Sequence, residues 1–248
     1  MEINLSEKRI IVTGGATGIG RASSLRVSQD GAKVALFDIN EKDSQKTIDA
    51  IRSSGGEARF WNVDVGDEDV VSRSVSEAEA WLGGIDSLLH FAGVLWGASV
   101  ELDEFPEETW DTVLDINLRG TYLMSKYVVA VMKKQKSGVI ILAASGAGVR
   151  GGSSSYAYGS SKGGVHGLTM VMQNALPKYG IRVHDIAPGS VKSPLKIGQM
   201  KSSAERTGNT TNVDRAIETL NDPEDVANIV AFMASDQAKL LRGTVFTG

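Results

Sequence analysis

Cysteine is absent from the 248-residue sequence, and the formal net charge is −4 at pH 7. A chain without cysteine can form neither a disulfide nor a thiolate metal site, which fits a reducing cytoplasm. The negative charge provides no basic surface of the sort that nucleic-acid binding requires. We therefore expect a cytoplasmic protein without a nucleic-acid partner.

Long apolar segments are also missing. No run of 18 consecutive apolar residues is present, so we expect no helix that spans a membrane and no membrane partner. The first residues lack the basic start and the apolar stretch of a signal peptide. His90, His166 and His184 do not show metal-ligand spacing, and we expect no metal site.

Apolar runs of strand length alternate with longer segments of helical length, which is typical of a parallel sheet covered on both faces. We expect strands near residues 8–13, 33–38, 57–63, 85–91, 138–144, 181–187 and 243–247. Helices are expected near residues 18–30, 41–54, 67–82, 107–135, 157–178 and 222–235. The predicted fold class is α/β, a single-domain Rossmann fold over residues 1–248 with a doubly wound seven-stranded parallel sheet.

A glycine-rich run at residues 14–20 directly follows the first expected strand. Small residues there let the backbone approach a pyrophosphate, which the first amides of the next helix can bind. The second expected strand ends at Asp38, roughly 20 residues further on, where an acidic residue can accept hydrogen bonds from an adenosine ribose. The combination predicts a dinucleotide site.

Tyr158 and Lys162 are four residues apart, so on a helix both lie on one face. A nearby positive charge favours a phenolate, whose ordinary pKa is near ~10, and such a pair can act as a general acid/base. Tyrosine and lysine at this spacing also occur by chance on solvated helices. Tyr156 is six residues before Lys162 and faces elsewhere, so we assign the acid/base role to Tyr158.

Taken together, these motifs resemble the short-chain dehydrogenase/reductase family, from one end of the chain to the other. The matching pieces are Thr13-Gly14-x-x-x-Gly18-x-Gly20, Asp64-Val65, Ala92-Gly93, Asn117, Ser145, Tyr158-x-x-x-Lys162 and Pro188-Gly189. The resemblance implies a catalytic set of Asn117, Ser145, Tyr158 and Lys162. In it Ser145 would hold the substrate oxygen, Tyr158 would exchange a proton with it, and Lys162 would lower the tyrosine pKa.

The resemblance also implies the residues that contact the cofactor. They are Gly14, Thr17, Gly18, Ile19, Gly20, Asp38, Ile39, Asp64, Val65, Ala92, Gly93, Tyr158, Lys162, Pro188, Gly189, Val191 and Ser193. The Asp38 carboxylate would repel the extra phosphate of NADP, and Ile39 and Asn40 offer no guanidinium to bind it. We therefore expect NAD. One departure is His90-Phe91, where family members usually have two asparagines.

The substrate side is less defined by the sequence. Residues 190–215 are polar and weakly periodic, an irregular insertion that the resemblance makes a substrate-binding loop. Ser145, Trp96, Arg150 and Tyr156 are the candidate substrate contacts. Arg150, Lys192 and Lys196 could anchor a carboxylate or phosphate, or could simply be solvated.

The predicted function is an NAD-dependent oxidoreductase that transfers hydride between nicotinamide and a small-molecule secondary alcohol or ketone. One alternative is a 3-oxoacyl-[acyl-carrier-protein] reductase, although those relatives commonly favour NADP. Another is a non-enzymatic dinucleotide sensor, but such proteins tend to lose the catalytic tyrosine or lysine. Apolar residues are spread around all sides of the helices expected at 107–135 and 157–178. In this family these helices pack against partner subunits, so we expect a homotetramer.

Overall fold

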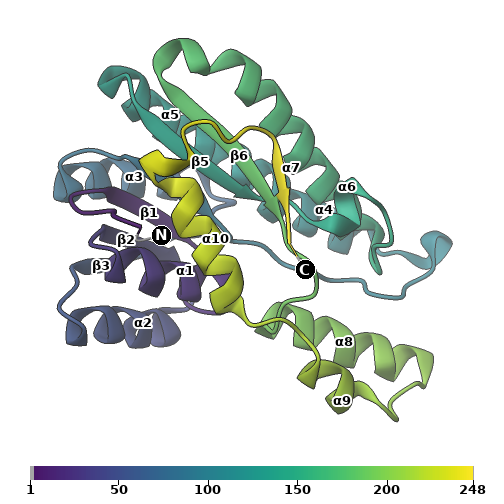
Figure 1. Cartoon of the computed structure of the whole chain (residues 1–248). Coiled ribbons are helices and arrows are strands. Elements are labelled where there is room, and N and C mark those ends of the chain that lie inside the picture. The colour runs from purple at the N-terminus through teal and green to yellow at the C-terminus, as the bar shows by residue number, and fades with distance from the viewer. Residues whose placement is uncertain (1–2, 248) are drawn as a thin grey trace.

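In a computed structural model of the chain, which describes residues 3–247, seven strands form one parallel sheet (Figure 1). The strands are β1 (Arg9–Thr13), β2 (Lys33–Asp38), β3 (Ala58–Asn62), β4 (Ser87–His90), β5 (Gly138–Ala143), β6 (Ile181–Ala187) and β7 (Thr244–Phe246). Their order is β3-β2-β1-β4-β5-β6-β7, which confirms the predicted fold. Because the order reverses between β1 and β4, a crevice is expected at the carboxyl ends of these strands.

Helices cover both faces of the sheet (Figure 1). On one face lie α1 (Gly18–Gln29), α2 (Glu41–Ser53) and α10 (Pro223–Ala234). The other carries α3 (Glu68–Leu82), α5 (Gly120–Gln135) and α7 (Tyr156–Ala175), with α4 (Glu107–Leu114) against α7. Within residues 3–247, no helix is long and apolar enough to cross a membrane.

Each face of the sheet has its own apolar core. Alternate residues of a strand point to opposite faces, so neighbours along β1 belong to different cores. Ile11 packs in the core with α3, α5 and α7, whereas Ile10 and Val12 pack in the core with α1, α2 and α10. The central strands are buried on both faces and therefore hold the site residues at their carboxyl ends on a rigid base.

The segment expected as one helix at 107–135 is helical between those bounds, but its middle is not α-helical. A π-helical segment, Asp115–Arg119, separates α4 from α5. Asn117 lies within it, fully buried, and its side chain bonds to Val94 and Ser161. Bulges of this kind are frequent at functional sites, and this one carries a predicted catalytic residue.

The segment at 190–215 is largely helical, contrary to the irregular insertion expected. It contains α8 (Pro194–Thr207) and the start of α9 (Val213–Glu218), and both helices stand apart from the two helical layers (Figure 1). Ser193 caps α8 by accepting a 3.2 Å hydrogen bond from the amide of Lys196, and Pro194 follows at the first helical position. Gly208 ends the helix with φ of 72°. These are ordinary start and stop signals.

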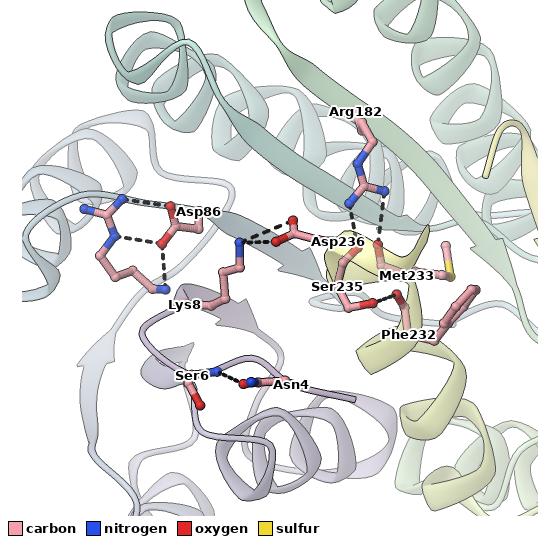
Figure 2. Close-up of polar contacts among 10 residues, drawn as sticks. Asn4, Ser6, Lys8, Asp86, Arg182, Phe232, Met233, Ser235 and Asp236 are labelled. Atoms are coloured by element: carbon pink, nitrogen blue, oxygen red, sulfur yellow. Dashed lines mark hydrogen bonds and ion pairs between the residues drawn. The ribbon is translucent and has the colours of Figure 1, made fainter. Parts of the chain in front are cut away.

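Polar contacts at the amino-terminal side of β1 and β6 hold the end of α10 (Figure 2). Arg182 of β6 donates to the carbonyl of Ser235 at 2.9 Å and to that of Met233 at 3.3 Å. Lys8 forms an ion pair of 3.1 Å with Asp236. The last carbonyls of a helix have no intrahelical donor, so Arg182 supplies what the end of α10 needs.

Candidate active site

The carboxyl ends of the strands open into a cleft of about 610 Å³. Ser145 lines it, together with every residue that the sequence assigned to the cofactor. The latter are Gly14, Thr17, Gly18, Ile19, Gly20, Asp38, Ile39, Asp64, Val65, Ala92, Gly93, Tyr158, Lys162, Pro188, Gly189, Val191 and Ser193. Motifs spread over almost the whole sequence therefore meet in one cavity.

The turn between β1 and α1 has space only for glycine at its key positions. A Cβ on Gly20 would lie 2.1 Å from the carbonyl oxygen of Gly14, and one on Gly14 would lie 2.8 Å from the amide nitrogen of Ala92. Gly14 and Gly18 also have positive φ values of 68° and 54°. The close approach and the amino terminus of α1 fit the pyrophosphate of a dinucleotide.

Asp38 connects this turn to the end of β2. One carboxylate oxygen accepts a 3.0 Å hydrogen bond from the amide of Ala16, and the other accepts a 2.9 Å bond from the amide of Asn40. Each oxygen keeps a further lone pair for a ligand hydroxyl. Ile39 lies beside it with 68% of its surface exposed, so an apolar wall adjoins the carboxylate. These groups fit an adenosine.

Tyr158 and Ser145 form a hydrogen-bonded pair in the cleft. Burial raises the pKa of Tyr158, and the hydrogen bond with the Ser145 side chain opposes that rise. Ser145 follows β5 and caps the short helix α6 (Gly146–Val149), because its hydroxyl accepts from the amide of Ala147 at 3.2 Å. The cap fixes the serine oxygen beside the tyrosine.

Lys162 places a buried ammonium next to this pair. Its Nζ lies 5.8 Å from the centroid of the Tyr158 ring and donates a 2.6 Å hydrogen bond to the carbonyl of Ala143. Burial lowers the pKa of Lys162 to about 8. We expected this ammonium to lower the pKa of Tyr158, but in the structure the effect of burial dominates and Ser145 is the group that opposes it.

Asn117 lies behind the cleft wall. Its Oδ1 accepts from the amide of Val94 at 2.8 Å, and its Nδ2 donates to the Val94 carbonyl at 2.9 Å and to Ser161 Oγ at 3.0 Å. A Cβ on Gly93 would lie 3.0 Å from Asn117 Oδ1 and 3.7 Å from Lys162 Nζ. The asparagine thus fixes the backbone after Gly93 close to Lys162.

His90 replaces the first usual asparagine and takes a structural role. Thr13 Oγ1 accepts from the amides of Phe91 and Ala92 at 3.2 and 3.1 Å, and lies 2.8 Å from His90 Nδ1. Because both lone pairs of Thr13 Oγ1 accept hydrogen bonds from these amides, the hydroxyl proton of Thr13 points to His90 Nδ1. Burial, with a contribution from the charge of Lys162, lowers the pKa of His90 to about 3. The imidazole is neutral at pH 7.

Three of the four candidate substrate contacts lie outside the cleft lining. Trp96 is 48% exposed, and the Arg150 guanidinium sits 3.6 Å above the Phe246 ring. Tyr156 packs edge-on against Phe105 with ring centroids 6.0 Å apart. Of the candidates, the structure brings Ser145 alone into the cleft.

Lys196, one of the three basic residues offered as an anchor, lines the cleft together with residues that the sequence did not single out for substrate. Lys196 and Gln199 of α8 line it, as do the aliphatic side chains of Val94, Leu95 and Leu195. Lys196 Nζ donates to Gln199 Oε1 at 2.9 Å. Their spacing of three residues becomes informative only when α8 is known to be a helix.

Comparison with known proteins agrees with this geometry. Residues 8–204 match the family described as short chain dehydrogenase. The chain is 33% identical to an uncharacterized oxidoreductase of Bacillus subtilis, over 98% of this chain and 90% of that protein.

Solved structures are similar over nearly their whole length. The crystal structure of levodione reductase has a TM-score of 0.91 at 29% identity, covering 97% of this chain and 96% of that one. NAD⁺-bound xylitol dehydrogenase has a TM-score of 0.89 at 28% identity, covering 98% of both chains. The chain belongs to the short-chain dehydrogenase/reductase family, whose oxidoreductases bind a nicotinamide dinucleotide.

Proposed function

We propose that the protein is an NAD-dependent oxidoreductase that interconverts a secondary alcohol and a ketone. The observation that carries this proposal is the position of the hydrogen-bonded pair of Tyr158 and Ser145 and the buried ammonium of Lys162. All three line the same cleft as the glycine-rich turn and Asp38. An acid/base group therefore adjoins a dinucleotide site.

The side chains of the cleft suit proton transfer to a carbonyl oxygen. A bound nicotinamide would supply or accept the hydride. Tyr158 is protonated at neutral pH because burial raises its pKa, so it can donate a proton to a ketone oxygen. Ser145 can donate a second hydrogen bond to the same oxygen as charge develops on it. In the opposite direction, the alcohol proton goes to the phenolate form of Tyr158, so alcohol oxidation requires the tyrosine to have lost its proton first.

Lys162 contributes a positive charge to the same step. With a pKa of about 8, its ammonium is mostly charged at pH 7, although only 5% of the residue is exposed to solvent. A charge in such surroundings acts more strongly than one in water. It can therefore stabilise negative charge that develops on the substrate oxygen. Asn117 positions the backbone beside it.

Asp38 supports NAD as the cofactor. Its carboxylate lines the cleft at the end of β2, where an additional ribose phosphate would meet a like charge. The residues that follow it, Ile39 and Asn40, are uncharged. The similar xylitol dehydrogenase is bound to NAD⁺, which favours the same choice for a chain with so similar a fold.

The proposal is tested by mixing the protein with NAD and a panel of polyols, sugars, hydroxysteroids, hydroxyacyl esters and hydroxy acids. The absorbance of NADH should rise with at least one class, and NADP should support a lower rate. Tight NAD binding without turnover across the whole panel would favour a dinucleotide sensor. Faster reaction with NADP would contradict the role given to Asp38.

A further inference from the structure

Helix α8 presents one face to the cleft. Ser193, Lys196, Gln199 and Ser203 follow each other at intervals of three or four residues, so on a helix they share a side. Lys196 and Gln199 both line the cavity. This part of the chain is thus a wall of the site rather than a separate surface loop.

Contacts at both ends of this face place it between the nucleotide and substrate parts of the cleft. At one end, a Cβ on Gly18 of the glycine-rich turn would lie 3.0 Å from Ser193 Cβ. At the other, Ser203 Oγ lies 2.7 Å from Ser99 Oγ, in the loop that contains Val94 and Leu95. Lys196 and Gln199 lie between these two contacts.

Lys196 is a half-buried cation whose hydrogen-bond partner is a neutral amide. Its Nζ donates to Gln199 Oε1 at 2.9 Å, and burial lowers its pKa. The two acidic residues that line the cleft are Asp38, at the end of β2, and Asp64, just after β3. Lys162 and Lys196 line the other part of the cleft, on the helices that follow β5 and β6. The catalytic part of the cleft is therefore positive.

We propose, resting on the oxidoreductase function above, that Lys196 and Gln199 bind a carboxylate of the substrate, which is then a hydroxy acid or its oxo acid. One carboxylate oxygen can accept a hydrogen bond from the Lys196 ammonium, and the other can accept one from the NH₂ group of the Gln199 side chain. The side-chain oxygen of Gln199 already accepts from Lys196, which turns the NH₂ group into the available donor. The aliphatic side chains of Val94, Leu95 and Leu195 suit a short carbon chain between this carboxylate and the reacting carbon.

The diphosphate of the cofactor is the other anion that could reach Lys196. The glycine-rich turn and the amino terminus of α1 already offer a diphosphate site. Gln199, one turn further along α8, extends the polar face toward Ser99 and away from Gly18. The position of the pair therefore favours the substrate.

The test compares hydroxy acids with their methyl esters, which have the same reacting alcohol but no charge. The probes are 2-hydroxypropanoate, 3-hydroxybutanoate and 4-hydroxypentanoate, each with NAD and wild type, Lys196→Met, Lys196→Arg and Lys192→Met. Lys192 was also offered by the sequence as an anchor, but it is exposed and lies outside the cleft lining, so it serves as the control. NAD affinity and thermal unfolding of each variant are measured separately.

We expect wild type to prefer at least one acid over its ester. Lys196→Met should reduce kcat/KM for that acid by roughly ten- to hundredfold, the usual effect of losing a hydrogen bond to a charged group, and should affect the ester much less. Lys196→Arg should restore part of the preference, and Lys192→Met should retain all of it. NAD affinity should stay unchanged.

Three results would overturn the inference while leaving the oxidoreductase function intact. They are equal use of acids and esters by wild type, an equal loss on both in Lys196→Met, and a loss of NAD affinity in that variant, which would assign Lys196 to the diphosphate. Absence of turnover on every alcohol would instead contradict the proposed function. Calorimetric binding of butanoate to the protein with NAD then decides: binding that Lys196→Met abolishes supports the anion site, and no binding rejects it.

Discussion

Lys162 carries a positive charge where burial opposes it. The folded protein lowers its pKa from 10.5 to about 8, and its side chain is 5% exposed. Each unit of this shift corresponds to about 1.4 kcal/mol of preference for the neutral form. The ammonium that we propose as catalytic therefore reduces the stability of the protein at neutral pH, a cost that enzymes often accept at their active sites.

Lys162→Met should remove activity and yet stabilise the fold. Between pH 8 and 10.5 the unfolded chain binds more protons at this lysine, so the free energy of unfolding of wild type rises with pH over that window. Below pH 8 the full cost applies, and the variant should be more stable by up to about 3 kcal/mol at pH 7. Urea unfolding at pH 7 and at a pH above 10.5 measures the difference, which should vanish at the higher pH. A variant less stable than wild type at pH 7 would contradict this.

Asp38→Asn should relax the choice of cofactor. The amide keeps an oxygen that can accept from Ala16 or Asn40, but no longer repels a phosphate. We expect kcat/KM for NADP relative to NAD to rise roughly tenfold or more, which corresponds to about 1.4 kcal/mol. Asp49→Asn, an exposed site on α2, removes the same charge away from the cleft and should leave the ratio unchanged. An equal ratio in the two variants would assign the selectivity to another group.

The π-helical segment Asp115–Arg119 lies between α4 and α5 and contacts α7. Through Asn117 it holds the backbone after β4 against α7, with hydrogen bonds to Val94 and Ser161. A continuous α-helix would rotate Asn117 relative to these partners. The irregular geometry is therefore maintained by tertiary contacts.

Asn117→Ala should weaken both the fold and the reaction. It leaves the amide and carbonyl of Val94 without their partners, which costs roughly 2–4 kcal/mol in the free energy of unfolding. It also frees the segment next to Lys162, so kcat should fall. Asn174→Ala, at an exposed site in α7 where the side chain bonds a local carbonyl, is the control and should change little. Chemical unfolding and steady-state rates of the two variants test this. Equal stabilities would show that the hydrogen bonds of Asn117 with the Val94 backbone do not stabilise the fold.

Strands and most helices could be predicted because buried parallel strands are continuous apolar runs with clear ends. The π-helical turn around Asn117 could not, since it depends on bonds to residues distant in the sequence. For α8, Ser193 and Pro194 are a recognisable signal for the start of a helix. The helix itself was not predicted, because it has too few apolar residues to show a helical periodicity. The cofactor residues lie in compact motifs at strand ends. The residues proposed for substrate do not lie in such motifs. Arg150, a candidate from the sequence, lies outside the cleft and contacts the Phe246 ring of β7, a contact that depends on the path of the distant carboxyl-terminal strand.

Apolar side chains remain exposed on α5 and α7. Tyr122 is 49% exposed, Met170 53% and Val171 66%, and Tyr122 lines a shallow hollow together with Leu114 and Leu118. Exposed apolar groups on two packed helices are typical of subunit interfaces. This distribution supports our expectation of a homotetramer.

Light scattering at micromolar concentration should give the mass of a homotetramer. Val171→Asp places a charge in the proposed interface and should shift the mass toward dimers or monomers. Leu240→Asp changes a side chain that is 82% exposed elsewhere on the molecule and should leave the assembly intact. A monomeric wild type would reject the expectation.

Proton transfer by Tyr158 beside a bound dinucleotide is the central claim, and the Tyr158→Phe variant tests it most directly. The phenyl ring keeps the shape of the site but has no proton to exchange with the substrate oxygen. With the best alcohol of the panel, NADH formation should slow by about 10²–10⁴-fold, the usual contribution of a general acid/base, while NAD affinity stays at the wild-type value. Tyr156→Phe, two residues away and packed on Phe105, should react at the wild-type rate. A Tyr158→Phe enzyme with a near-normal rate of NADH formation would contradict the account.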